Sequence, residues 1–109
     1  EKYEVEISAY TDGDFIRPHW DRGDGVTRGR RLTNLFYFHA EPPGFKGGQL
    51  QLFDTGPDGD FDEAKWTGVA PTTNMLLQFR SEAIHAVSPV TGGMTFAACR
   101  FCLTFWAWE

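Results

Sequence analysis

The feature that most limits the fold of this chain is a succession of short strand-like segments separated by turns. Apolar and polar residues alternate from Lys2 to Tyr10, a pattern with period two that predicts a half-buried strand with Tyr3, Val5 and Ile7 on its buried face. Further strand-like segments follow at residues 15–21, 32–39, 49–53, 75–79, 83–87 and 96–108. Because helical periodicity is almost absent, these segments predict an all-β core, an antiparallel sandwich or barrel, with a jelly roll favoured.

The stretches between these segments are rich in Gly, Pro and Asp, which supply turns. We expect a turn-rich connection over residues 41–48, an exposed acidic loop over residues 54–66 and a turn over residues 90–93. The chain has 109 residues, with no internal repeat and no linker, so a single domain spanning residues 1–109 is expected. A chain of this length buries roughly 65% of its unfolded surface, enough for one core.

The composition argues against two classes of partner. The net charge is −5 and the pI about 5.1, which disfavours nucleic acid and anionic membrane surfaces. No apolar run approaches the ~20 residues of a membrane helix, and no signal peptide is visible.

Cys99 and Cys102 are expected on opposite faces of the last strand, where they cannot share a disulfide or a metal. Reduced thiols suit a reducing compartment, so a cytoplasmic location is expected.

His19 and Asp21 form the most informative short motif. Two residues apart in a predicted strand, their side chains point to the same face. Imidazole and carboxylate suit a borderline divalent ion, and His85 is the expected third ligand. Two histidines and one carboxylate on one face of Fe(II) are typical of non-haem oxygenases, because the opposite positions stay open. A site of His19, His39 and His85 is the alternative, disfavoured because Asp21 would then have no role beside the metal.

Arg100 lies in an otherwise apolar segment near the end of the chain. Burying a guanidinium is costly unless an anion meets it, and its planar fork matches a carboxylate through two hydrogen bonds. We therefore expect Arg100 to hold the distal carboxylate of a cosubstrate, the alternatives being an exposed arginine or an internal ion pair. The hydroxyl groups of Tyr37 and Tyr10 are candidate additional donors.

These residues belong to an ordered set of motifs. The set runs through Tyr10-x-x-Gly13, His19-x-Asp21, Arg30-x-x-Thr33, Tyr37, Gly47-Gly48-x-Leu50, Phe79-x-Ser81, His85, Pro89-Val90 and Arg100-x-x-Leu103-Thr104-Phe105-Trp106. With this set the chain resembles the Fe(II)/2-oxoglutarate-dependent dioxygenases, and within them the prolyl-4-hydroxylase-like branch. The resemblance covers nearly all of the chain. It implies a double-stranded β-helix, a jelly roll, whose usual flanking helices are largely absent from these residues.

The resemblance also implies roles for individual residues. His19, Asp21 and His85 match the family's iron ligands, and Arg100 matches the basic residue that holds 2-oxoglutarate. The remaining matched positions contact the cosubstrate or line its pocket: Tyr37, Tyr10, Leu35, Leu50, Val87, Thr104 and Trp106. The implied reaction is hydroxylation of an unactivated C–H bond with Fe(II), 2-oxoglutarate and O₂, supported by ascorbate, with release of succinate and CO₂. The implied substrate is a prolyl residue, an amino acid or a small metabolite.

The chain departs from the family pattern in the long interval between His85 and Arg100, and in Ile16, which stands where an aromatic residue is common. The retained carboxylate of Asp21 favours hydroxylation over halogenation, because halogenases of this class lack it. Trp20 is expected to turn away from the metal and pack. The arginines after the metal motif either recognise an acidic group of the substrate or belong to a solvated loop, and a structural role is a further alternative for Arg30: Arg22, Arg28, Arg30 and Arg31.

Two alternatives come from other classes of protein. One is a non-catalytic jelly-roll module that binds a ligand or partner and needs no iron. The other is a metal enzyme of the cupin type that does not use 2-oxoglutarate, in which Arg100 would be dispensable for activity.

Overall fold

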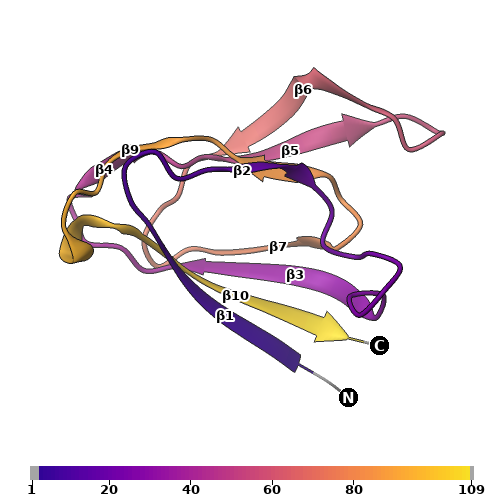
Figure 1. Ribbon diagram of the computed structural model, residues 1–109, viewed down its shortest axis with the longest axis horizontal. Coiled ribbons are helices and arrows are strands. Elements are labelled where there is room, and N and C mark those ends of the chain that lie inside the picture. Colours follow the sequence, from indigo (N-terminus) through magenta and orange to yellow (C-terminus); the bar gives the residue numbers. More distant parts are fainter. Residues whose placement is uncertain (1–2, 109) are drawn as a thin grey trace.

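Two four-stranded antiparallel sheets lie one above the other and form the body of the protein (Figure 1). The structure, a computed structural model, describes residues 3–108. The first sheet has the order β1 (Tyr3–Tyr10), β10 (Arg100–Trp108), β3 (Arg30–Tyr37) and β7 (Leu76–Arg80). The second has the order β2 (Ile16–His19), β8 (His85–Val87), β5 (Leu50–Thr55) and β6 (Phe61–Val69). A shorter pair, β4 (Phe45–Gly47) and β9 (Val90–Gly92), lies at one end.

This strand order confirms the predicted jelly roll, or double-stranded β-helix. Apart from the β5–β6 hairpin and the short pair β4 and β9, successive strands alternate between the two sheets, so that residues distant in sequence meet between them. Within residues 3–108 there is no α-helix, and no helix long and apolar enough to cross a membrane. A single 3₁₀ turn, Phe96–Ala98, precedes β10.

Three expectations about strand positions were wrong. Residues 61–66, expected in an acidic loop, belong to β6, whose first eight residues are all exposed. β6 is an edge strand that projects with the end of β5 beyond the rest of the molecule, so neither of its faces needs an apolar pattern (Figure 1). The turns expected over 41–48 and 90–93 contain β4 and β9, which are too short to show a period. The last strand begins at Arg100 rather than at residue 96, which leaves Cys99 outside it.

The predicted inner face of β1 was also wrong. Tyr3, Val5 and Ile7 lie on the outer face and are 65%, 66% and 69% exposed. The alternate residues Glu6 and Ser8 instead line a cavity between the sheets. The period-two pattern therefore identified the strand correctly, but this strand presents its polar residues to a cavity rather than apolar residues to a packed core.

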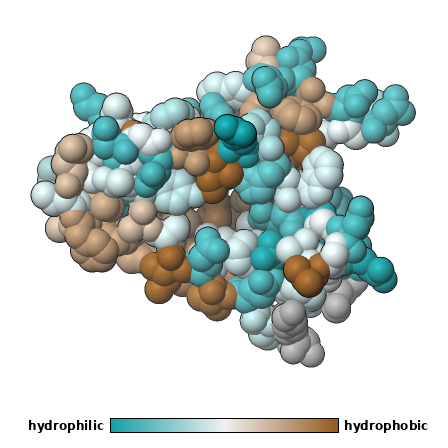
Figure 2. All heavy atoms as spheres, in the orientation of Figure 1, coloured by the Kyte–Doolittle hydropathy of each residue, from teal (hydrophilic) through white to brown (hydrophobic). Residues whose placement is uncertain are grey.

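The apolar core lies between the sheets beside this cavity. Its largest cluster joins Leu35, Tyr37, Leu50 and Cys102, and a smaller one joins Phe53, Ile84 and Ala86. Cys99 and Cys102 are both buried and both free thiols. The face shown in Figure 2 is hollowed near its centre, with hydrophobic atoms at the bottom of the hollow.

Candidate metal centre

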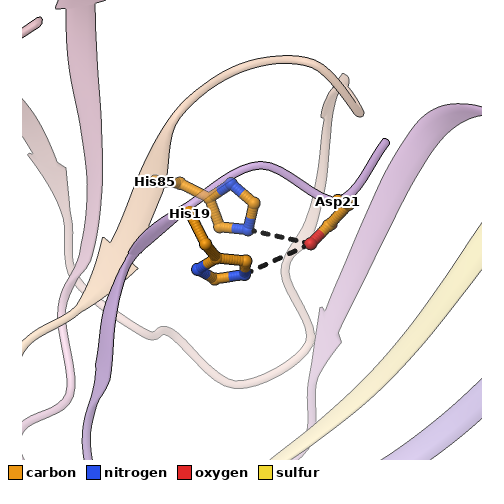
Figure 3. A group of neighbouring side chains, drawn as sticks. All are labelled: His19, Asp21 and His85. Carbon is orange, nitrogen blue, oxygen red and sulfur yellow. Dashed lines mark ion pairs between the residues drawn. The ribbon is translucent and has the colours of Figure 1, made fainter. Parts of the chain in front are cut away.

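The side chains of His19, Asp21 and His85 converge at one point between the sheets (Figure 3). The Nε2 atoms of His19 and His85 lie 3.2 Å and 3.5 Å from Oδ1 of Asp21. Ligands bound at right angles to one metal, each about 2.1 Å from it, lie about 3 Å apart. Each histidine nitrogen is therefore spaced from Oδ1 as a neighbouring ligand of the same ion would be, and all three atoms lie within 4.8 Å of one another. Imidazole with carboxylate is a donor set that suits Fe(II).

Both imidazole rings are oriented by backbone carbonyl groups. Nδ1 of His19 lies 2.8 Å from the carbonyl oxygen of Arg17, and Nδ1 of His85 lies 2.9 Å from that of Ala83. In each case the partner is two residues earlier in the chain. When Nδ1 carries the proton it donates to this carbonyl, and Nε2 keeps the free lone pair that a metal needs. Phe79 packs edge-on against the His85 ring with centroids 4.7 Å apart.

One carboxylate oxygen of Asp21 faces the two histidines, and the other accepts hydrogen bonds from the protein. Oδ2 accepts hydrogen bonds from Oγ1 of Thr33 at 2.8 Å and from Nε1 of Trp106 at 3.1 Å. Burial raises the pKa of this carboxyl, but its interactions with His19 and His85 and the hydrogen bond from Trp106 outweigh it and hold the pKa well below its usual range. Asp21 is therefore held as an anion with Oδ1 as its free ligand atom.

The backbone around Asp21 is fixed by a neighbouring turn. The amide groups of Asp21 and Arg22 both donate to the carbonyl oxygen of Ser81, at 2.9 Å and 3.0 Å. The Ser81 hydroxyl lies 2.9 Å from that of Thr33, and both residues are at most 1% exposed. Asp21 lies two residues beyond the end of β2, so these contacts, rather than strand alternation, place it beside His19. The sequence motifs contained Thr33 and Ser81 but gave them no role.

Arg100 lies at a second polar point of the same cavity. It is only 2% exposed, and its Nε donates to the carbonyl oxygen of Gly48 at 2.9 Å. Within residues 3–108 no carboxylate pairs with it, so its charge faces the cavity uncompensated. Gly48 makes room for the side chain: its φ is +64°, and a Cβ there would lie 2.6 Å from Cδ of Arg100.

Two tyrosine rings flank the Arg100 guanidinium. Its carbon Cζ lies 4.8 Å from the ring centroid of Tyr10 and 5.1 Å from that of Tyr37. The Tyr37 hydroxyl is fully buried and makes no hydrogen bond within the described part of the chain. Burial raises the pKa of Tyr37 to about 12 against the opposing charge of Arg100, so its hydroxyl stays a donor. A buried cation and an unpaired hydroxyl are the groups that a small dicarboxylate would satisfy.

The remaining predicted pocket residues line this cavity, which has a volume of about 390 Å³. They supply its apolar wall and one hydroxyl: Leu35, Leu50, Val87, Thr104 and Trp106. Tyr37 is buried behind this lining rather than in it. The third histidine, His39, is not part of the metal group and packs edge-on against Phe45.

The structure also shows where Trp20 and the arginines after the metal motif lie. Trp20 was expected to pack, but it is 56% exposed and lines the cavity, because β2 ends at His19 and alternation no longer applies. Of the arginines after the metal motif, only Arg30 lines the cavity, whereas Arg22, Arg28 and Arg31 do not.

Comparison with known proteins gives consistent matches. A family model described as the 2OG-Fe(II) oxygenase superfamily matches residues 5–108. An uncharacterized PKHD-type hydroxylase from Synechocystis is 34% identical over 94% of this chain and 35% of its own length. A PKHD-type hydroxylase from Maricaulis maris is 33% identical over 82% of this chain and 36% of its own length. The chain thus spans about a third of these relatives.

Solved structures agree in fold. A prolyl-4-hydroxylase from Pseudomonas putida superposes with a TM-score of 0.71 at 29% identity, covering 100% of this chain and 52% of that one. A 2OG-Fe(II) oxygenase family protein from Burkholderia pseudomallei superposes with a TM-score of 0.69 at 17% identity, covering 96% of this chain and 43% of that one. The second likeness concerns the fold alone.

Proposed function

The chain belongs to the 2OG-Fe(II) oxygenase superfamily, and on that basis we propose that it hydroxylates an unactivated C–H bond using Fe(II), 2-oxoglutarate and O₂, with release of succinate and CO₂. Its substrate is a small molecule or a peptide, with a prolyl residue among the candidates because a prolyl-4-hydroxylase is a structural neighbour. Its net charge of −5 disfavours nucleic acid and anionic membrane surfaces as partners.

The observation that carries this proposal is the position of Arg100. A buried arginine with no carboxylate partner in residues 3–108 shares one cavity with a complete two-histidine, one-carboxylate set. A metal enzyme that used no dicarboxylate would leave this guanidinium with an unmet cost of burial. The combination therefore favours a 2-oxoglutarate-dependent enzyme over a cupin-type enzyme and over a module without catalysis.

The protein's part in the reaction is to hold and shield the reactants. His19, Asp21 and His85 would hold the metal, and Arg100 would pair with the distal carboxylate of 2-oxoglutarate. Bound Fe(II), with 2-oxoglutarate and O₂, supplies the oxidising chemistry. The apolar wall that includes Leu35, Leu50 and Val87 limits the access of water. Because Asp21 keeps its place in the set, hydroxylation is favoured over halogenation.

Succinate formation tests this proposal. We expect 2-oxoglutarate turnover with Fe(II) and ascorbate in the wild type, and loss of it in His19→Ala. Arg100→Ala is expected to raise the KM for 2-oxoglutarate at least tenfold, whereas Arg80→Ala, at a side chain 81% exposed, leaves it unchanged. Failure of the wild type to bind Fe(II) in an anaerobic titration would overturn the proposal. Activity of Arg100→Ala equal to that of the wild type would support the cupin-type enzyme instead.

A further inference from the structure

The inner face of β1 runs along the cavity. The charged residues of the cavity lining differ between the two ends of this strand. In the pairing of β1 with β10, Tyr10 lies opposite Arg100, and Glu6 lies opposite Thr104. At about 3.3 Å per residue, Glu6 is about 13 Å along the strand from Tyr10. Trp106, which contacts the carboxylate of the metal set, is the next inward residue of β10 after Thr104. Glu6 therefore lies near the level of the metal set, away from the Arg100 end.

The only arginine near Glu6 in the cavity lining is already engaged. Nε and Nη2 of Arg30 donate to the two carboxylate oxygens of Glu4, at 2.8 Å and 3.0 Å. Nη1 donates to the carbonyl oxygen of Asp21 at 3.4 Å, and the guanidinium lies 3.9 Å from the ring centroid of Trp106. The ion pair neutralises Arg30, so this arginine is poorly placed to attract an anionic substrate.

Glu6 is the one charged side chain of this region that has no partner. It is exposed, it lines the cavity, and it makes no hydrogen bond or ion pair with the residues that the structure describes. Glu4, Glu6 and Arg30 together leave one net negative charge here. The opposite end of the cavity carries the positive charge of Arg100, which the proposed function assigns to 2-oxoglutarate.

Trp20 adds an aromatic surface to the same cavity. It follows His19 directly, lies 56% exposed and belongs to the cavity lining. An exposed indole and an unpaired carboxylate in one cavity are a combination that can bind an organic cation, because the face of the ring attracts positive charge. With Arg100 assigned to 2-oxoglutarate and Arg30 paired with Glu4, the described residues of this lining offer no further arginine or lysine to an anionic substrate.

We propose that Glu6 and Trp20 bind a cationic group of the substrate, a primary ammonium or a guanidinium. This inference rests on the proposed function. The cation pairs with the Glu6 carboxylate and contacts the Trp20 ring, and carbon atoms a few bonds away face the metal set. Such a cationic group is present both in a free amine and in the lysine or arginine side chain of a peptide.

Binding of charge-matched probes tests this inference without turnover. The protein is loaded with Mn(II) and the unreactive cosubstrate analogue N-oxalylglycine, and binding is followed by tryptophan fluorescence and calorimetry. One series compares pentylamine, pentanol and pentanoate. A second series compares acetyl-Gly-Lys-Gly-amide with the same peptide carrying norleucine, which distinguishes a free amine from a peptide side chain. We expect at least one cationic probe to bind about tenfold more tightly than its neutral match, with a preference that weakens at high salt.

The Glu6→Gln variant is expected to lose this preference, and Glu63→Gln, an exposed carboxylate on β6, to keep it. Trp20→Ala is expected to weaken binding of the cation about threefold, with the Mn(II) and N-oxalylglycine affinities as a separate readout. Equal binding of cationic and neutral probes, or a preference that survives in Glu6→Gln, overturns the inference. Succinate formation without charge preference refutes the inference alone. A Glu6-dependent preference without any succinate formation refutes the proposed function alone and leaves the cation site.

Discussion

Nε1 of Trp106 donates to Oδ2 of Asp21 over 3.1 Å, and this hydrogen bond links the last strand of the chain to the carboxylate of the metal set. The two residues are 85 positions apart, and the jelly-roll topology brings them together. The contact leaves Oδ1 as the oxygen that faces both histidines. Trp106 is therefore a positioning residue for Asp21 as well as part of the cavity wall.

Replacing Trp106 with Phe should weaken metal binding while keeping most of the packing. The variant loses the indole donor but retains an aromatic ring at a site only 8% exposed. Loss of a partner that orients a metal ligand typically lowers affinity about 10- to 100-fold. An anaerobic Fe(II) titration measures the effect, and Trp66→Phe, on the exposed strand β6, serves as control. An unchanged Fe(II) affinity would show that the hydrogen bond does not position Asp21.

Thr33→Val should destabilise the protein and also weaken metal binding. The hydroxyl is buried at 1% exposure and joins Asp21 to Ser81, so its loss leaves two buried oxygens with fewer partners. We expect a loss of about 1–3 kcal/mol in the free energy of unfolding. Urea denaturation of the metal-free protein checks this value, and Thr33→Ser, which keeps the hydroxyl, should lose much less. Equal losses in the two variants would assign the effect to packing.

The candidate metal ligands could be proposed from the sequence because their chemistry is carried by residue type and order. His19 and Asp21 were identified although strand alternation, the reason given for their shared direction, ends at His19. Their convergence depends on the contacts of Ser81 and Thr33, which involve backbone atoms and small hydroxyl groups with no distinctive pattern. The sequence therefore pointed to the grouping of His19, Asp21 and His85 that the structure shows, but not to the physical cause of its geometry.

Strands could be predicted from the sequence where one face is buried and the other is exposed to solvent. β6 was missed because both of its faces are exposed, and the inner face of β1 was misjudged because that face presents polar residues to a cavity. An alternating pattern identifies a strand, but it does not show which face of the strand points inward when the interior contains a cavity lined partly by polar residues. The polar face of β1 includes Glu6, on which the proposed cation site depends.

Gly48→Ala should impair cosubstrate binding more than metal binding. The added Cβ would lie 2.6 Å from Cδ and 2.9 Å from Nε of Arg100, so the guanidinium must shift. We expect the KM for 2-oxoglutarate to rise about tenfold with little change in Fe(II) affinity, since Gly48 is not in contact with the metal set. Gly13→Ala is the matched control: its φ is also positive, at +88°, but nothing lies within 4 Å of the new atom. Equal effects in both variants would indicate backbone strain rather than displacement of Arg100.

His39 should make the folded protein less stable as the pH falls. Its side chain is 1% exposed and neither ring nitrogen makes a hydrogen bond in the described residues, so burial lowers its pKa despite the nearby carboxylate of Glu41. The unfolded state then binds a proton more readily than the folded state, and stability is lost as the pH drops through about 6.5. His39→Leu lacks this component. The wild type's free energy of unfolding, measured relative to that of His39→Leu by urea denaturation, should therefore be lower at pH 5.5 than at pH 7.5. A difference between the two proteins that stays constant across this range would contradict the burial of a neutral imidazole.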